Sequence, residues 1–79
     1  MGLRSGKGLW RKIYDDGTLD QYCGYYENDK KNGYGEYSWA NGNLYKGEFV
    51  DDFKHGSGVM YFNDGTIFKG NWVGGKMIQ

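Results

Sequence analysis

The chain repeats itself every 23 residues. Shifting the sequence by 23 places aligns an aromatic residue, a glycine and a second aromatic residue in three segments, which are QYCGYY (21–26), LYKGEF (44–49) and IFKGNW (67–72). The glycines of the intervening stretches align under the same shift: Gly33 with Gly56, Gly35 with Gly58 and Gly42 with Gly65. A fixed period of this length indicates an array of short structural units. The repeat therefore constrains the fold more than any other feature of the chain.

Side chains alternate between apolar and polar within each unit, and we find no helical period, so the predicted fold class is all-β. We expect one layer of twisted antiparallel hairpins, a meander of about six strands that forms an elongated array. The expected strands are 8–14, 18–26, 34–39, 43–50, 57–62 and 66–73, with polar connections at 27–33 and 51–56. Residues 1–79 form a single domain in this prediction, with an irregular longer first hairpin at 6–26, regular units at 22–44 and 45–67, and a partial unit at 68–79.

Each unit contains a turn signal, at DDG (15–17), ANG (40–42) and NDG (63–65). A three-residue loop fits these triplets, because Asp and Asn favour turns and glycine tolerates positive φ. A two-residue turn is the competing interpretation. Only the longer loop keeps the large apolar side chains of the last hairpin on one side of the sheet, so we prefer it; these are Met60, Phe62, Phe68 and Trp72.

The first hairpin carries two extra residues on each side of its turn, relative to the second. Side chains alternate with a period of two, so an even insertion on both strands moves no side chain to the opposite face. The insertion lengthens the hairpin by about 7 Å, at roughly 3.4 Å per residue.

Alternation along these strands places most aromatic side chains on one face. The predicted aromatic groove consists of Trp10, Tyr14, Tyr22, Tyr26, Tyr37, Trp39, Tyr45, Phe49, Met60, Phe62, Phe68 and Trp72. Glycines fall on the same face, where they leave space for neighbouring rings to lie flat across the backbone; they are Gly8, Gly24, Gly35, Gly47, Gly58 and Gly70. The opposite face is mostly polar, with Tyr25, Tyr34 and Tyr61 among its side chains.

The size of this aromatic face bears on its role. If half of the roughly 150 to 250 Å² of each ring stays uncovered, eleven rings leave on the order of 800 to 1,400 Å² exposed. Monomers rarely expose a contiguous apolar patch above a few hundred Å². We expect that twist and curling of the sheet hide part of the surface and that a partner hides the rest. A plain core is the alternative, and both interpretations can hold together.

The repeated pattern of Tyr/Phe-x-Gly-x-aromatic, then Gly-x-Gly, then an Asp/Asn-Gly turn resembles the MORN repeat (membrane occupation and recognition nexus). YKGEFVDDFKHGSGVMYFNDG, at 45–65, contains nearly the whole pattern, and the resemblance extends over 6–73. It implies an array of hairpins with an aromatic groove. It also implies a scaffolding role among protein partners, in membrane-linked, cytoskeletal or ciliary assemblies, without catalysis in the repeat itself.

Residues with other chemistry are interpreted as structural. His55 is the only histidine and is expected in a solvated loop, while Cys23 has no companion cysteine or histidine for zinc. GLRSGKG at 2–8 has the wrong spacing for a phosphate loop, and the N-terminus fails the myristoylation pattern. The remaining charged candidates are loop residues for which solvation is the favoured interpretation: Asp15, Asp16, Asp51 and Asp52 as acidic pairs, and Lys30, Lys31 and Lys54 as a small basic ridge.

Ten basic and ten acidic residues cancel, so bulk charge does not steer the chain to nucleic acid or to an anionic membrane. With one cysteine, no internal disulfide is available, and we find no apolar run near the roughly 20 residues of a membrane helix. The prediction is a non-enzymatic, cytoplasmic interaction module without cofactor or metal, whose groove binds a helical or extended segment of a protein partner.

The sequence leaves several alternatives open. Phospholipid head groups could bind through the lysine loops, and edge strands could pair between copies. Stacking of single-stranded nucleic acid or sugar on exposed rings is a third possibility, weakened for nucleic acid by the balanced charge. An enzyme is the least favoured, because no nucleophile, base and orienting group can be assembled.

Overall fold

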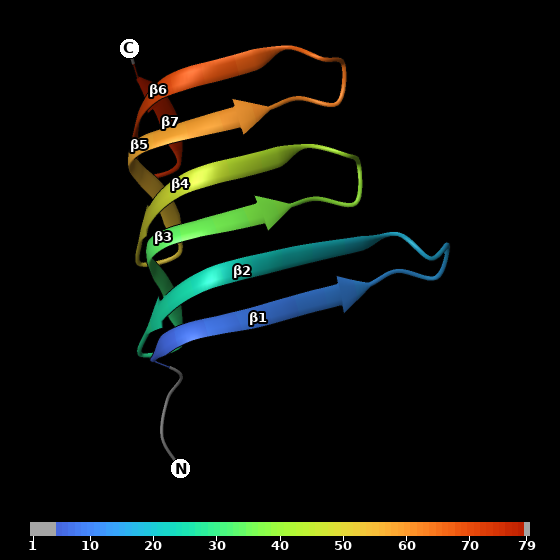
Figure 1. The fold of residues 1–79 in the computed structure, drawn as a ribbon, viewed down its shortest axis with the longest axis horizontal. Helices are drawn as coiled ribbons and strands as arrows, with labels where there is room; N and C mark the ends of the chain where they lie inside the picture. The colour runs from blue at the N-terminus through green and yellow to red at the C-terminus, as the bar shows by residue number, and fades with distance from the viewer. Residues whose placement is uncertain (1–4, 79) are drawn as a thin grey trace.

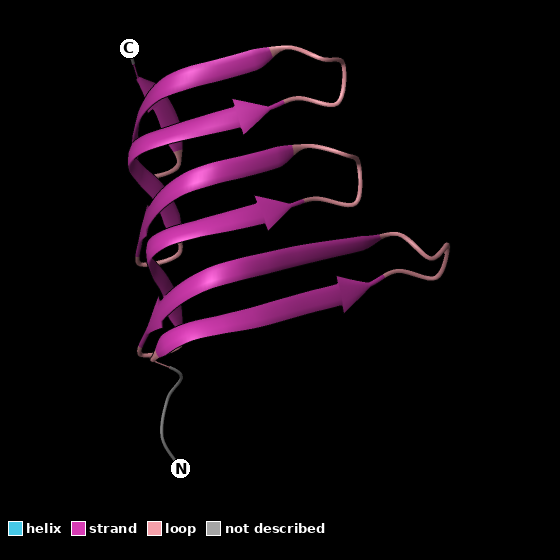
Figure 2. Cartoon of the chain, in the orientation of Figure 1, coloured by secondary structure: helices cyan, strands magenta, loops and turns pink. Residues whose placement is uncertain are grey.

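The computed structural model describes residues 5–78, which form one open antiparallel sheet (Figures 1 and 2). The strands follow one another across the sheet in chain order: β1 (Gly6–Ile13), β2 (Leu19–Glu27), β3 (Lys30–Ser38), β4 (Leu44–Val50), β5 (Phe53–Tyr61), β6 (Ile67–Val73) and β7 (Lys76–Ile78). The molecule measures 41 × 34 × 16 Å, as expected for a curved single layer. The described residues contain no helix that is long and apolar enough to cross a membrane. The predicted all-β meander is confirmed.

Three-residue turns join the two strands of each long hairpin, as predicted. In the last of them, the Phe62 amide donates to the Thr66 carbonyl at 2.8 Å, and the Gly65 amide donates back to the Phe62 carbonyl at 3.0 Å. The same pair of bonds recurs around the turns at 15–17 and 40–42. The third residue of each turn is a glycine with φ between 89° and 97°. Met60 consequently faces Phe68 across the hairpin.

The connections predicted at 27–33 and 51–56 are wrong in extent. The chain reverses there within two residues, Asn28–Asp29 and Asp51–Asp52, and all four have positive φ. Consecutive positive φ values are those of a type I′ turn, whose twist matches that of the flanking strands. Residues 30–33 and 53–56 therefore belong to β3 and β5, and the pairs continue to Glu27↔Lys30 and Val50↔Phe53.

The strands bend shortly before they reach these two-residue turns. Gly33 and Gly56 have φ of 95° and 72° within their strands, and the pairing register shifts beside each of them. Such bulges bend a strand, and glycine accepts the required φ. Figure 1 shows the strands curving at the side of the sheet where the two-residue turns lie.

A seventh strand is present where the sequence predicted only the end of a partial unit. Gly74 and Gly75 form a third two-residue turn with positive φ, and Lys76–Ile78 pairs with β6. At the other side of the sheet, the first hairpin projects beyond the others, because two extra residue pairs separate the Gly8↔Gly24 pair from its turn (Figure 1).

Glycines on the inner face leave room for aromatic rings. A Cβ atom at Gly35 would come within 2.5 Å of Cε1 of Tyr22, and one at Gly58 would come equally close to Cε1 of Tyr45. A Cβ at Gly70 would lie 2.9 Å from Cζ of Phe68. Real Cβ contacts are longer than this, so each ring occupies the space of the missing side chain.

Candidate functional site

Six rings form a continuous row along the inner face and cross the boundaries between units. Neighbouring rings meet edge to face at interplanar angles of 79° to 89° and centroid distances of 5.2 to 5.6 Å, in the order Tyr26, Tyr22, Phe49, Tyr45, Trp72, Phe68. Aromatic pairs favour this arrangement, which adds about 0.5 to 1.5 kcal/mol per pair beyond area burial. The first five rings of the row belong to the buried core of the sheet, and Phe68 packs against it while only partly buried.

The two central tyrosines are fully buried, and their hydroxyl groups are hydrogen-bonded. Tyr22 donates to the Tyr25 carbonyl at 2.8 Å, and Tyr45 donates to the Glu48 carbonyl at 3.0 Å. Burial raises the pKa of each phenol to about 12, because the phenolate would lose its hydration. Both tyrosines therefore stay protonated and act as structural anchors.

The predicted groove divides into a buried half and an accessible half. Tyr22, Tyr26, Tyr45, Phe49, Met60 and Trp72 are at most 8% exposed, so they form the core. The partly buried residues that pack against this core are Trp10, Tyr37, Trp39, Phe62 and Phe68. Tyr14, near the tip of the first hairpin, is exposed, and its hydroxyl donates to Asp20 Oδ2 at 2.7 Å. A partner on this face would meet the second group, which we call the rim rings: Trp10, Tyr37, Trp39, Phe62 and Phe68.

Two lysines approach the same face, which the sequence did not reveal. Nζ of Lys31 lies 5.6 Å from the ring centroid of Tyr22 and 5.5 Å from that of Tyr37. Nζ of Lys54 lies 5.2 Å from the Trp39 ring. Ammonium groups at such distances are attracted by the negative face of a ring. The one available signal was that both lysines lie an even number of residues from the glycines at 35 and 58.

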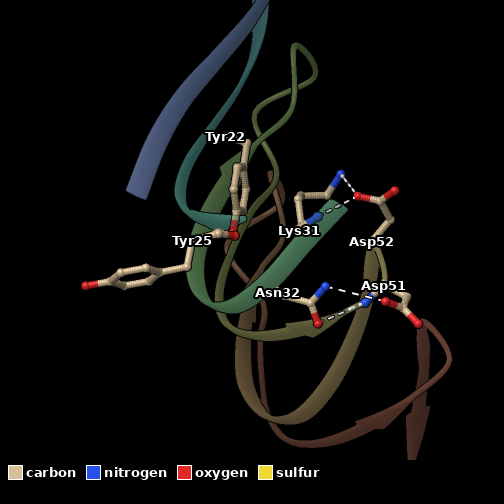
Figure 3. A network of polar contacts seen from close by, with 6 residues as sticks. All are labelled: Tyr22, Tyr25, Lys31, Asn32, Asp51 and Asp52. Carbon is tan, nitrogen blue, oxygen red and sulfur yellow. Dashed lines mark hydrogen bonds and ion pairs between the residues drawn. The ribbon is translucent and has the colours of Figure 1, made fainter. Parts of the chain in front are cut away.

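Lys31 is paired with a carboxylate from the next unit (Figure 3). Asp52 Oδ1 accepts the Lys31 main-chain N–H at 2.8 Å and lies 3.3 Å from Lys31 Nζ. Partial burial acts to raise the pKa of the Asp52 carboxyl, but the hydrogen bonds and charge of Lys31 outweigh it and hold the pKa below its usual value. Beside this pair, Asn32 and Asp51 exchange two longer hydrogen bonds of 3.3 and 3.4 Å.

Lys54 occupies the equivalent position one unit later, but its surroundings differ. Its Nζ lies 5.3 Å from the Trp72 ring and 5.7 Å from the Tyr45 ring. Burial among these rings, together with repulsion from Lys31, lowers the pKa of the Lys54 ammonium. Within residues 5–78, no carboxylate forms an ion pair with Lys54.

Both faces of the sheet are hollowed. A cleft of about 220 Å³ on the inner face is lined by rings together with Asp29, Lys31 and Asp52. A wider hollow of about 590 Å³ lies on the opposite face among solvated side chains such as Lys46, Glu48 and Lys69. We place the candidate site on the inner face, since the rim rings and both lysines converge there.

The other candidate residues lie apart from this face. Cys23 is exposed on β2, and His55 is exposed on β5 rather than in a loop. Asp16 is exposed and caps its own turn through hydrogen bonds from Thr18. No group of three potential metal ligands occurs among the described residues. Part of the 2–8 stretch, residues 2–4, lies outside the described residues.

Comparison with known families agrees with the geometry. The family model for the MORN repeat matches residues 22–44 and 45–67, which are the two regular units. These ranges cover more than half of the chain and contain Tyr22, Tyr45 and both inward-facing lysines. No curated protein matches the chain.

Proposed function

Because this chain belongs to the MORN-repeat family, we propose that it is a non-catalytic module that binds a segment of a partner protein on its inner, aromatic face. MORN repeats are interaction and membrane-binding modules. The finer assignment, to this face and to a helical or extended protein segment, is our proposal. A single layer leaves one side of the core open, so a segment lying along it would complete a second layer.

The observation that carries the proposal is that the rim rings stay partly exposed although the core beneath them is already buried. The six core residues are buried without help from a second layer, whereas the rim rings, which include two tryptophans, stay only partly covered. Tryptophan and tyrosine dominate the binding energy of many protein interfaces. Rings that the fold does not need to bury completely are therefore available as anchors.

The test compares rim rings with exposed rings of the opposite face. The double substitution Trp39→Ala and Phe62→Ala truncates two rim rings, while Tyr25→Ala and Tyr34→Ala truncate two rings that are 47% and 51% exposed on the other side. A photo-crosslinker placed at 62 or at 34 identifies the bound protein, which is then purified and titrated against all variants. We expect only the rim variant to lose binding. Equal binding by both double variants would reject the inner face.

Binding to phospholipid head groups is the second candidate, and the two inward lysines favour it. Vesicle flotation with anionic and neutral lipid, at low and high salt, separates it from protein binding. Salt-sensitive flotation with anionic vesicles alone would support it. Negligible flotation with both would dismiss it.

We further propose a cytoplasmic location, with attachment to cytoskeletal, ciliary or membrane structures through the partner. The proposal is supported by the family membership, since MORN repeats are interaction and membrane-binding modules. Imaging of a fluorescently tagged chain, with and without the Trp39→Ala and Phe62→Ala substitutions, tests it. A diffuse signal for the substituted chain and a localised one for the native chain are expected.

A further inference from the structure

The pairing of Lys31 with Asp52 shows how a unit supplies a carboxylate to its neighbour. Asp52 is the second residue of the turn between β4 and β5, and its main-chain N–H donates to the Lys31 carbonyl at 3.0 Å. Its side chain then turns back to accept from the Lys31 N–H and to approach Nζ (Figure 3). The charge of Lys31 among the rings is thus neutralised by a carboxylate of the next unit.

The same backbone arrangement recurs at Lys54 without the carboxylate. Gly75 stands 23 residues after Asp52, and its N–H donates to the Lys54 carbonyl at 3.0 Å. Its φ of 87° is close to the 75° of Asp52. The turn is therefore equivalent, but glycine offers no side chain. The N–H of Lys54 points to the same side of its strand as its carbonyl, toward the place that a carboxylate occupies beside Lys31.

The space for a carboxylate is open. A Cβ atom built on Gly75 meets only Cδ1 of Phe53, at 3.5 Å, which is an ordinary contact. The ammonium of Lys54 is meanwhile held among Trp39, Tyr45 and Trp72 and is repelled by Lys31. A partly buried cation without a counter-charge is costly in proportion to the hydration it has lost, and an incoming anion relieves that cost.

We propose that Lys54 receives an aspartate or glutamate side chain of the partner protein, which takes the place over Lys54 that Asp52 takes over Lys31. This inference rests on the proposed function and specifies its chemistry: the bound segment is acidic at one position and apolar beside it. The acidic group meets the ammonium and main-chain N–H of Lys54, and the apolar neighbours lie on Trp39 and Phe68. Charge-assisted hydrogen bonds of this kind are about twice as strong as neutral ones.

A pair of capped peptides tests the proposal: leucines flanking a central aspartate, and the same peptide with asparagine. Each is titrated into the isotope-labelled full chain, and amide shifts are followed by NMR. We expect the aspartate peptide to move the amide signals of Lys54 and Gly75 and to bind about tenfold or more tightly than the asparagine peptide, the factor for a hydrogen bond to a charged group. Equal affinity for the two peptides would overturn the proposal.

Two substitutions and one control locate the site. Lys54→Gln removes the cation, and Gly75→Asp supplies an internal carboxylate at a backbone conformation that Asp52 already adopts. Both are expected to abolish the preference for the aspartate peptide. Lys46→Gln is the control, because Lys46 also lies over a ring, that of Tyr61 at 5.7 Å, but on the opposite face. A Gly75→Asp chain that binds the aspartate peptide as tightly as the native chain would contradict the proposal.

The proposal would also be overturned if the negative charge that binds Lys54 came from a ligand other than a partner protein. Vesicles containing phosphatidylserine, bound in a Lys54-dependent way when the peptide is not, would identify a lipid ligand. Concentration-dependent self-association lost in Lys54→Gln would identify a second copy. Failure of the inference can be told from failure of the proposed function. If only the inference fails, a partner crosslinked at the rim rings still binds the Lys54→Gln variant as tightly as the native chain. If the proposed function fails, no partner depends on the rim rings.

Discussion

The ring of Tyr45 lies against the backbone of Gly58 on the adjacent strand, so that a methyl group at position 58 would overlap the ring. We expect Gly58→Ala to displace Tyr45 and to lower the free energy of unfolding by about 3 kcal/mol or more, at the upper end of overpacking effects. Urea denaturation followed by circular dichroism measures the change.

Gly8→Ala is the matched control for this substitution. Gly8 also faces a ring, but its Cβ would lie 3.2 Å from Cε2 of Tyr26, so a shift of a few tenths of an ångström accommodates it. The loss should stay below about 1 kcal/mol, as for a tolerated change in packing. Similar losses at both positions would show that the ring contact does not determine the requirement for glycine.

Tyr45→Phe should cost about 1 kcal/mol of unfolding free energy, the usual value of one hydrogen bond, because the donor to the Glu48 carbonyl is lost. The ring itself should remain in place, since Phe68 occupies the equivalent position against Gly70 in the next unit. Thermal unfolding measures the effect. Tyr34→Phe, at an exposed position of the other face, should leave stability unchanged.

Alkaline solution should destabilise the protein through its two fully buried phenols, those of Tyr22 and Tyr45. The pKa of Tyr22 and of Tyr45 is about 12 when folded, against 10.0 when exposed. A raised pKa contributes stability that is complete below pH 10 and is lost as the pH rises toward 12, roughly 2 kcal/mol for each group. Tyrosinate absorbance and circular dichroism should change together in this window. Tyr45→Phe should lose about half as much stability there, and an identical pH profile would refute the assignment.

Asp52→Asn should weaken the contact between adjacent units by about 0.5 to 1 kcal/mol at neutral pH, since its side chain is partly exposed and solvent screens the pair. The folded carboxyl has a pKa below the ordinary 3.8, so its contribution is present above that value and disappears as the pH falls through the lower folded pKa. The stability difference between native chain and variant should therefore shrink in acid. Asp51→Asn, whose contact with Asn32 is longer, serves as the comparison.

The sequence predicted the features that are encoded locally. The triplet at 63–65 specifies its turn because glycine follows two turn-forming residues, and the 23-residue shift identifies the strands on either side. Alternation was then sufficient to place Tyr22 and Tyr45 on one face with their glycines. Which rings are buried did not follow, because burial depends on how far the sheet bends.

The approach of the two lysines to the rings, which the sequence did not predict, depends on how the strands bend. The polar sequence around Lys31 and Lys54 predicted solvated connections, whereas both residues lie within strands, in β3 and β5. They reach the rings only because Gly33 and Gly56 adopt positive φ and carry the strand onward to a two-residue turn. The turn at Asp51–Asp52 contains no glycine, so its type I′ conformation had no strong signal.

The edge-to-face row from Tyr26 to Phe68 has no gap where one unit meets the next. Phe49, for example, touches Tyr22 of the preceding hairpin as well as Tyr45 of its own strand. Loss of any one hairpin would strip its neighbour of contacts, so we expect melting to be all-or-none despite the modular sequence. The amide protons of Gly24 and Gly58 should then exchange with solvent with the same free energy of opening. Protection of one half of the sheet without protection of the other half would contradict this.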